Sequence, residues 1–135
     1  MLHSKHITLL PGQTEATLTP TRFRLNMGVI YRAWLTFPSG CAGLVKVRIL
    51  HEGHPILPVE KDANISGDGV VLVYPLMYEI LAAPEQITIE AWNEDDIYSH
   101  TIDVQFLIIP KMWILPVGAS EGLVASLRSL FVRGR

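Results

Sequence analysis

The residues from Gly28 to His51 decide the fold, and they read GVIYRAWLTF (28–37), PSGCAG (38–43) and LVKVRILH (44–51). The two outer segments are rich in β-branched and aromatic residues, and the middle one holds the proline and glycines that a chain reversal needs. In the last segment an apolar row alternates with a mostly polar one: Val45, Val47 and Ile49 against Lys46, Arg48 and Leu50. We therefore predict two antiparallel strands that face each other across a tight connection.

Other alternating segments predict strands through most of the chain. Residues 86–92 and 98–108 flank a polar turn and predict a hairpin whose core face includes Val104 and Phe106. Residues 70–74 predict a buried strand closed by Pro75, 77–81 a helical turn or irregular crossover, 56–59 a short edge strand and 16–19 a further strand. Roughly six to eight strands without a long helix among them predict an all-β fold, an antiparallel β-sandwich or jelly roll.

The chain divides into three parts. Residues 1–27 form an N-terminal arm with the first strand or strands, residues 28–110 the β-sandwich core, and residues 111–135 a connector followed by a helix. Pro110 and Pro116 flank the apolar part of the connector and stiffen it, and Ser120 can cap the helix. Apolar residues then recur at helical spacing and predict a short amphipathic helix of about three turns, which is marginal alone in water and needs a surface to pack against.

Composition points to an assembly of several copies. Apolar residues make up 49% of the chain, which is high for a free monomer of this size and predicts that some apolar surface lies in an interface. The net charge of −2 argues against a nucleic-acid groove. The single cysteine, Cys41, excludes an intramolecular disulfide framework.

The sequence also bears on location. Residues 1–6 lack an apolar signal core, so we expect no secretion by that route. No run reaches the roughly eighteen apolar residues that a bilayer span needs. We therefore expect no membrane span.

Three histidines are the only metal candidates that the sequence offers. His51 and His54 are three residues apart across a glycine turn, and His100 is distant in the sequence, so the spacing does not match the His-x-His pattern of a cupin barrel. Solvated turn histidines are the favoured interpretation. Cys41 has no nucleophile motif around it, and the acidic turn at 94–96 is typical of a hairpin kept soluble by charge. We predict no catalytic site, no metal and no cofactor.

Three aromatic residues, Trp34, Trp92 and Tyr98, offer an alternative. Together they could form a flat platform for sugars, as in a carbohydrate-binding β-sandwich. Tryptophans of this kind also serve at subunit contacts. A carbohydrate-binding module, and below it a cupin-like metal-binding protein, therefore remain rival functional hypotheses.

The C-terminal segment is the best functional lead. Its apolar residues can cover the chain's own sheet, cross to a neighbouring subunit, or dock on a membrane through arginines. The polar face is too rich in serine and alanine for strong membrane binding. Because two prolines hold the connector extended, we favour the neighbour and predict interchain burial of Trp113, Ile114, Leu115, Leu123, Leu127, Leu130 and Phe131.

In general character the chain resembles the jelly-roll decoration (cement) proteins of tailed-phage capsids. The resemblance rests on the β-rich middle from Val29 to Ile109, the N-terminal arm and the C-terminal extension. It implies a homotrimer on the virion surface that reinforces a capsid or shell protein without chemistry; outside a virus we expect the cytoplasm. The sequence thus predicts a non-enzymatic assembly protein whose terminal segments clasp neighbouring copies.

Overall fold

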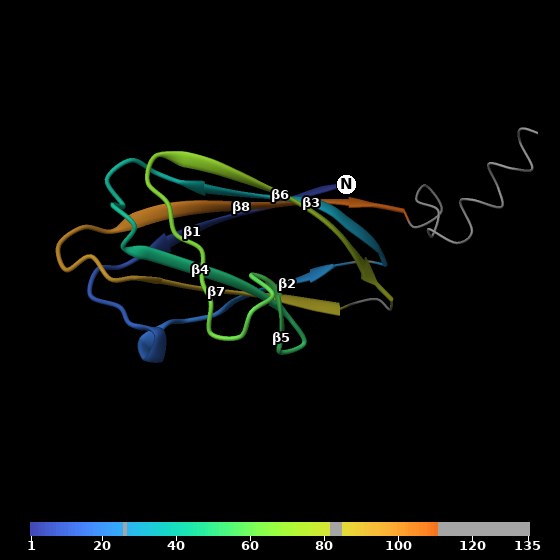
Figure 1. The fold of residues 1–135 in the computed structure, drawn as a ribbon, viewed down its shortest axis with the longest axis horizontal. Coiled ribbons are helices and arrows are strands. Elements are labelled where there is room, and N and C mark those ends of the chain that lie inside the picture. Colours follow the sequence, from blue (N-terminus) through green and yellow to red (C-terminus); the bar gives the residue numbers. More distant parts are fainter. Residues whose placement is uncertain (26, 82–84, 111–135) are drawn as a thin grey trace, which may run out of the picture.

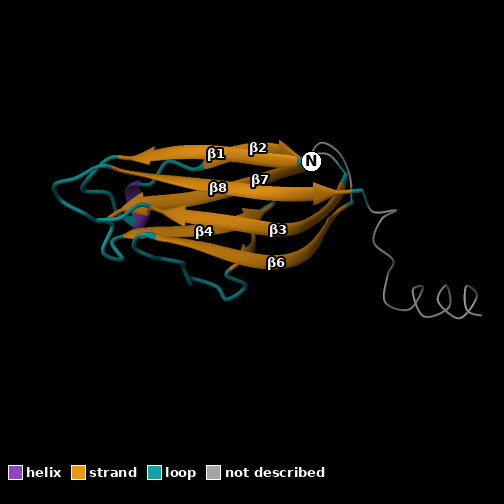
Figure 2. Cartoon of the chain, turned by 90° about the horizontal axis from the view of Figure 1, so that it is seen from above, coloured by secondary structure: helices purple, strands orange, loops and turns teal. Residues whose placement is uncertain are grey.

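Two four-stranded antiparallel sheets form the fold (Figures 1 and 2). The computed structural model describes residues 1–25, 27–81 and 85–110. The first sheet has the order β1 (Leu2–Leu9), β8 (His100–Ile109), β3 (Gly28–Phe37) and β6 (Val70–Ile80). The second has the order β2 (Thr21–Leu25), β7 (Glu85–Asn93), β4 (Val45–His51) and β5 (His54–Leu57). The prediction of an all-β, sandwich-like fold is confirmed.

The alternation along the strands explains why the two sheets pack face to face. On β4 the side chains of Val45, Val47 and Ile49 are fully buried, as the sequence predicts. The inward faces of β7 and β8 are also apolar up to Asn93 and His100 at one end, and the rings of Phe23 on β2 and Phe106 on β8 meet across the layers with centroids 5.3 Å apart. Burial of these rows is the main force that holds the sheets together.

The strands pair in a nested order. β1 pairs with β8, β2 with β7, β3 with β6 and β4 with β5, so the chain behaves as one long hairpin folded over on itself. Two further pairings, β8 with β3 and β7 with β4, complete the sheets.

Both predicted hairpins are wrong in their pairing, although the strands themselves are present. β3 and β4 lie in different sheets, and so do β7 and β8. In Figure 1 the links after β3 and after β7 both cross from one layer to the other at the same end of the molecule. Alternation tells which side chains face inward, but not which strand is the neighbour, and a link of about six residues is long enough to cross the roughly 10 Å between sheets.

The segment predicted as a buried strand ending at Pro75 is also different in the structure. β6 runs on through Pro75 to Ile80, so residues 77–80 belong to the strand and not to the helical turn or irregular crossover predicted for 77–81. β6 is an end strand of its sheet, and Val71 and Val73 are about half exposed, at 54% and 48%. An edge strand tolerates a proline because its nitrogen can face away from the neighbouring strand.

Smaller differences concern the N-terminal part. Residues 16–19 do not form a strand; Glu15–Thr17 is a single 3-10 turn, η1, whose start is closed by reciprocal hydrogen bonds between Thr14 and Thr17. The predicted short edge strand at 56–59 is found as β5, shifted two residues toward the N-terminus.

The predicted C-terminal connector and helix, residues 111–135, lie outside the described residues. In the described part of the chain, no helix is long and apolar enough to cross a bilayer.

Candidate functional site

A polar network closes the end of the molecule where the inter-sheet links lie. Its centre is Asn93, the last residue of β7, whose side chain is fully buried. The Asn93 amide nitrogen donates to the carbonyl oxygens of Leu9 (3.2 Å) and Tyr98 (2.8 Å). Its amide oxygen accepts from the backbone N–H of Asp95 at 3.0 Å. One side chain thus joins the end of β1 to the link between β7 and β8.

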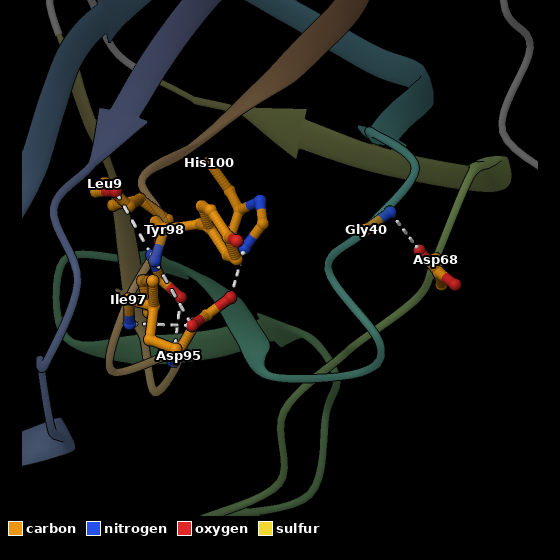
Figure 3. A network of polar contacts seen from close by, with 8 residues as sticks. Leu9, Gly40, Asp68, Asp95, Ile97, Tyr98 and His100 are labelled. Atoms are coloured by element: carbon orange, nitrogen blue, oxygen red, sulfur yellow. Dashed lines mark hydrogen bonds and ion pairs between the residues drawn. The ribbon is translucent and has the colours of Figure 1, made fainter.

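Asp95 and His100 extend this network (Figure 3). One carboxylate oxygen of Asp95 accepts from the backbone N–H groups of Ile97 (2.9 Å) and Tyr98 (3.3 Å), and the other meets Nε2 of His100 at 2.9 Å. The hydrogen bond from Ile97, followed by that from His100, lowers the pKa of Asp95 below its ordinary value of 3.8. The acidic turn is therefore a hydrogen-bonded loop anchor, a role that its sequence does not reveal.

Cys41 lies at the same end but is not placed for nucleophilic chemistry. Its side chain is fully buried. Burial, with smaller contributions from the negative charges of Asp68 and Asp95, raises the pKa of the thiol. A reactive cysteine needs the opposite: a lowered pKa and access to substrate. Asp68 itself accepts from the backbone N–H of Gly40 at 2.8 Å and fastens the link after β3 (Figure 3).

The three histidines singled out as metal candidates are not brought together. His51 and His54 face each other across the β4–β5 turn, and Nδ1 of His51 is hydrogen-bonded to the hydroxyl of Tyr78 on β6. His51 pairs with Ile87, whereas His100 lies at the Asn93 end of β7, about 20 Å further along that strand. Among the described residues, no group of three or more metal-ligating side chains gathers.

The outward face of the second sheet carries a charged cluster. Arg48 on β4 binds Glu15 of η1 at 2.7 Å and Glu90 of β7 at 3.2 Å, and it lies over the ring of Trp92, 5.3 Å from the ring centre. Burial on its own lowers the pKa of Arg48, but the hydrogen bonds with the two glutamates raise it overall.

Beside Arg48 is a small open pocket of about 210 Å³. Its described lining mixes both signs of charge, as in Lys61 and Glu60, and includes no histidine, serine or cysteine. The described lining therefore offers no histidine base paired with a serine or cysteine nucleophile.

The aromatic platform considered as a sugar site does not form. Trp34 is half-buried on the outward face of the first sheet, whereas Trp92 belongs to the second sheet and is only 3% exposed. Arg48 lies over the ring of Trp92, and η1 contacts β7, the strand that carries this tryptophan. Tyr98 is exposed in the link between β7 and β8. The two tryptophans lie on the outward faces of different sheets, so they cannot form one flat surface.

β6 carries exposed apolar side chains in the described part of the chain, a feature that the sequence interpretation missed because it predicted a buried strand at 70–74. Val71, Val73 and Met77 point outward and are all about half exposed. The inward side chains of this strand, including Leu72 and Tyr74, are only partly buried against the core. The signal was present in the sequence: residues 70–78 are uncharged and almost wholly apolar, a run typical of a strand covered on both faces.

The residues predicted to make interchain contacts, from Trp113 to Phe131, lie outside the described part of the chain. Comparisons with protein-family models, with curated proteins and with solved structures found no match.

Proposed function

We propose that this chain is a non-enzymatic structural protein that assembles with copies of itself, with a trimer as the favoured state. Its terminal segments clasp neighbouring subunits, and the assembly reinforces a larger shell, as decoration proteins do on phage capsids.

The topology supports a jelly roll. The strand orders β1-β8-β3-β6 and β2-β7-β4-β5, with nested antiparallel pairs, are what results when one long hairpin is rolled into two layers. This architecture is common in viral capsid proteins and also occurs in lectins and cupins. Because one fold serves many unrelated functions, the functional assignment rests on the exposed surface of the molecule.

The observation that carries the proposal is the uncovered surface of β6. An edge strand of eleven residues with no charge between Val70 and Tyr78, and with both faces apolar, is a template for pairing with another chain. Such an edge attracts further strands unless an assembly covers it. In an assembly of copies, a neighbouring subunit can cover this edge, whereas an isolated binding module has no neighbour to cover it.

The test is the molar mass in solution. Size-exclusion chromatography with light scattering over a range of concentrations should give a defined multiple of the 15.1 kDa chain mass, with three copies favoured. A truncated variant that ends at Pro110 should form particles with fewer copies of the chain. It should keep the β-sheet circular dichroism spectrum, because both sheets are built from residues 1–110. A full-length chain that stays at 15.1 kDa at all concentrations would refute the assembly proposal.

A further inference from the structure

The free edge of β6 differs from the other three sheet edges in the structure. β1 carries Lys5 among its exposed residues, β2 is five residues long with Arg22 and Arg24, and β5 has four residues including a proline. Charges, shortness and prolines are the devices by which edge strands avoid pairing with other chains. β6 has eleven residues, and its first five, Val70–Tyr74, contain none of these devices.

The side of β6 that is open to pairing can be inferred from Pro75. The register from Val70 to Pro75 is continuous against β3, and a proline is tolerated in a ladder when its nitrogen faces away from the partner. In a regular strand the residues two and four positions earlier have the same orientation. The N–H groups of Val73 and Val71 therefore face the free edge.

A strand that covers this edge must be apolar on both faces, because β6 is apolar on both faces. The covering strand therefore needs a consecutive uncharged run and not an alternating one. Outside β6, such a run occurs at Met112–Leu115, which reads MWIL between Lys111 and Pro116. Its length of four residues suits the five-residue open stretch of β6.

Geometry decides which copy of the chain can supply that run. Ile109 is level with Glu79, because both residues pair with Val29. The free edge lies about 14 Å across from β8, which is three strand spacings, and Tyr74 lies about 16 Å further along β6. Together these amount to roughly 21 Å, while the three residues from Ile109 to Met112 span at most about 11 Å. A chain's own Met112–Leu115 run cannot reach its own open stretch.

We propose that Met112–Leu115 of one copy adds as a strand to the Val70–Tyr74 edge of a neighbouring copy. The inference rests on the proposed homo-oligomeric function and names the surface that receives the tail. The contact joins two different surfaces, so it permits closure into a ring such as a trimer, which a contact between two identical edges does not.

The experiment uses full-length variants and mixing. Val73→Lys places a charge at the receiving edge, and Ile114→Lys places one in the donated strand. Each variant alone should run at the single-chain mass of 15.1 kDa in light scattering. Mixed in equal amounts they should give a dimer, because the intact tail of the Val73 variant can bind the intact edge of the Ile114 variant. Val59→Lys is the matched control: the same substitution at a valine that is 73% exposed in a loop should leave the assembly unchanged.

Several results would overturn this inference. If Ile114→Lys stays assembled while Val73→Lys does not, β6 pairs with β6 of another copy. If both variants stay assembled, or if the mixture yields no dimer, the tail does not occupy this edge. If the unmodified chain is monomeric, the proposed function fails together with this inference. Should Val73→Lys not fold, Val71→Lys tests the same edge, because Val71 has the same orientation and is 54% exposed.

Discussion

Replacing Asn93 by alanine should reveal how much stability the polar network at the link end contributes. The side chain is 0% exposed and makes three hydrogen bonds, two as donor to the carbonyls of Leu9 and Tyr98 and one as acceptor from the backbone of Asp95. A buried hydrogen bond contributes about 1 kcal/mol net, and a buried group left without a partner costs more. We expect Asn93→Ala to lower the free energy of unfolding by about 3 kcal/mol.

The assay is urea unfolding followed by circular dichroism and tryptophan fluorescence. With a slope of about 1.5 kcal/mol per molar urea, the loss corresponds to a midpoint lower by about 2 M. Protein concentration must be the same in all samples, because assembly contributes to apparent stability. Asn64→Ala is the control: Asn64 is exposed in a loop, and its loss should change the free energy by less than about 0.5 kcal/mol. A change below about 1 kcal/mol in Asn93→Ala would refute the reasoning that this side chain holds β1 to the β7–β8 link.

Two further predictions concern the same end of the molecule. The pKa of Asp95 is lowered in the folded state, so the contribution of its carboxylate to stability is present above the ordinary value of 3.8 and is lost as the pH falls through the folded pKa. At pH 7 the urea midpoint of Asp95→Asn should therefore lie below that of the unmodified protein. Below pH 3.8 the two midpoints should converge. A gap that persists undiminished at low pH would contradict this assignment. Cys41, buried and with a raised pKa, should react with iodoacetamide at least roughly tenfold more slowly in the native protein than in urea, as mass spectrometry can measure.

The sequence predicted the strands well because their inward faces alternate with period two. Ile102, Val104 and Phe106 are buried as predicted, and so are the inward residues of β4. Alternation reports the environment of each side chain but carries no information on which strand lies beside it. For that reason both predicted hairpins had the right strands and the wrong partners.

The candidate sites were harder to predict than the strands. The role of Asp95 depends on a loop geometry that only the folded chain defines, and an acidic turn in a sequence is more often a solvated one. The continuous apolar run at 70–74 predicts a buried strand, and the structure places it in a longer strand at the edge of its sheet instead. A run that is apolar on both faces indicates that both faces are covered, but it does not tell which segment covers them.

The nested order of the strands has a consequence for how the protein is made. Ser4 and Asp103, which are hydrogen-bonded across the outermost pair, are 99 residues apart in the chain. At about 5–20 residues per second, a ribosome needs roughly 5–20 s between making the first strand and making its partner. During that time β1 has no β8 to pair with, and the first sheet cannot close before synthesis has nearly reached the C-terminal segment. Folding of this sheet therefore follows the synthesis of β8, which comes directly before the segment proposed to bind a neighbour.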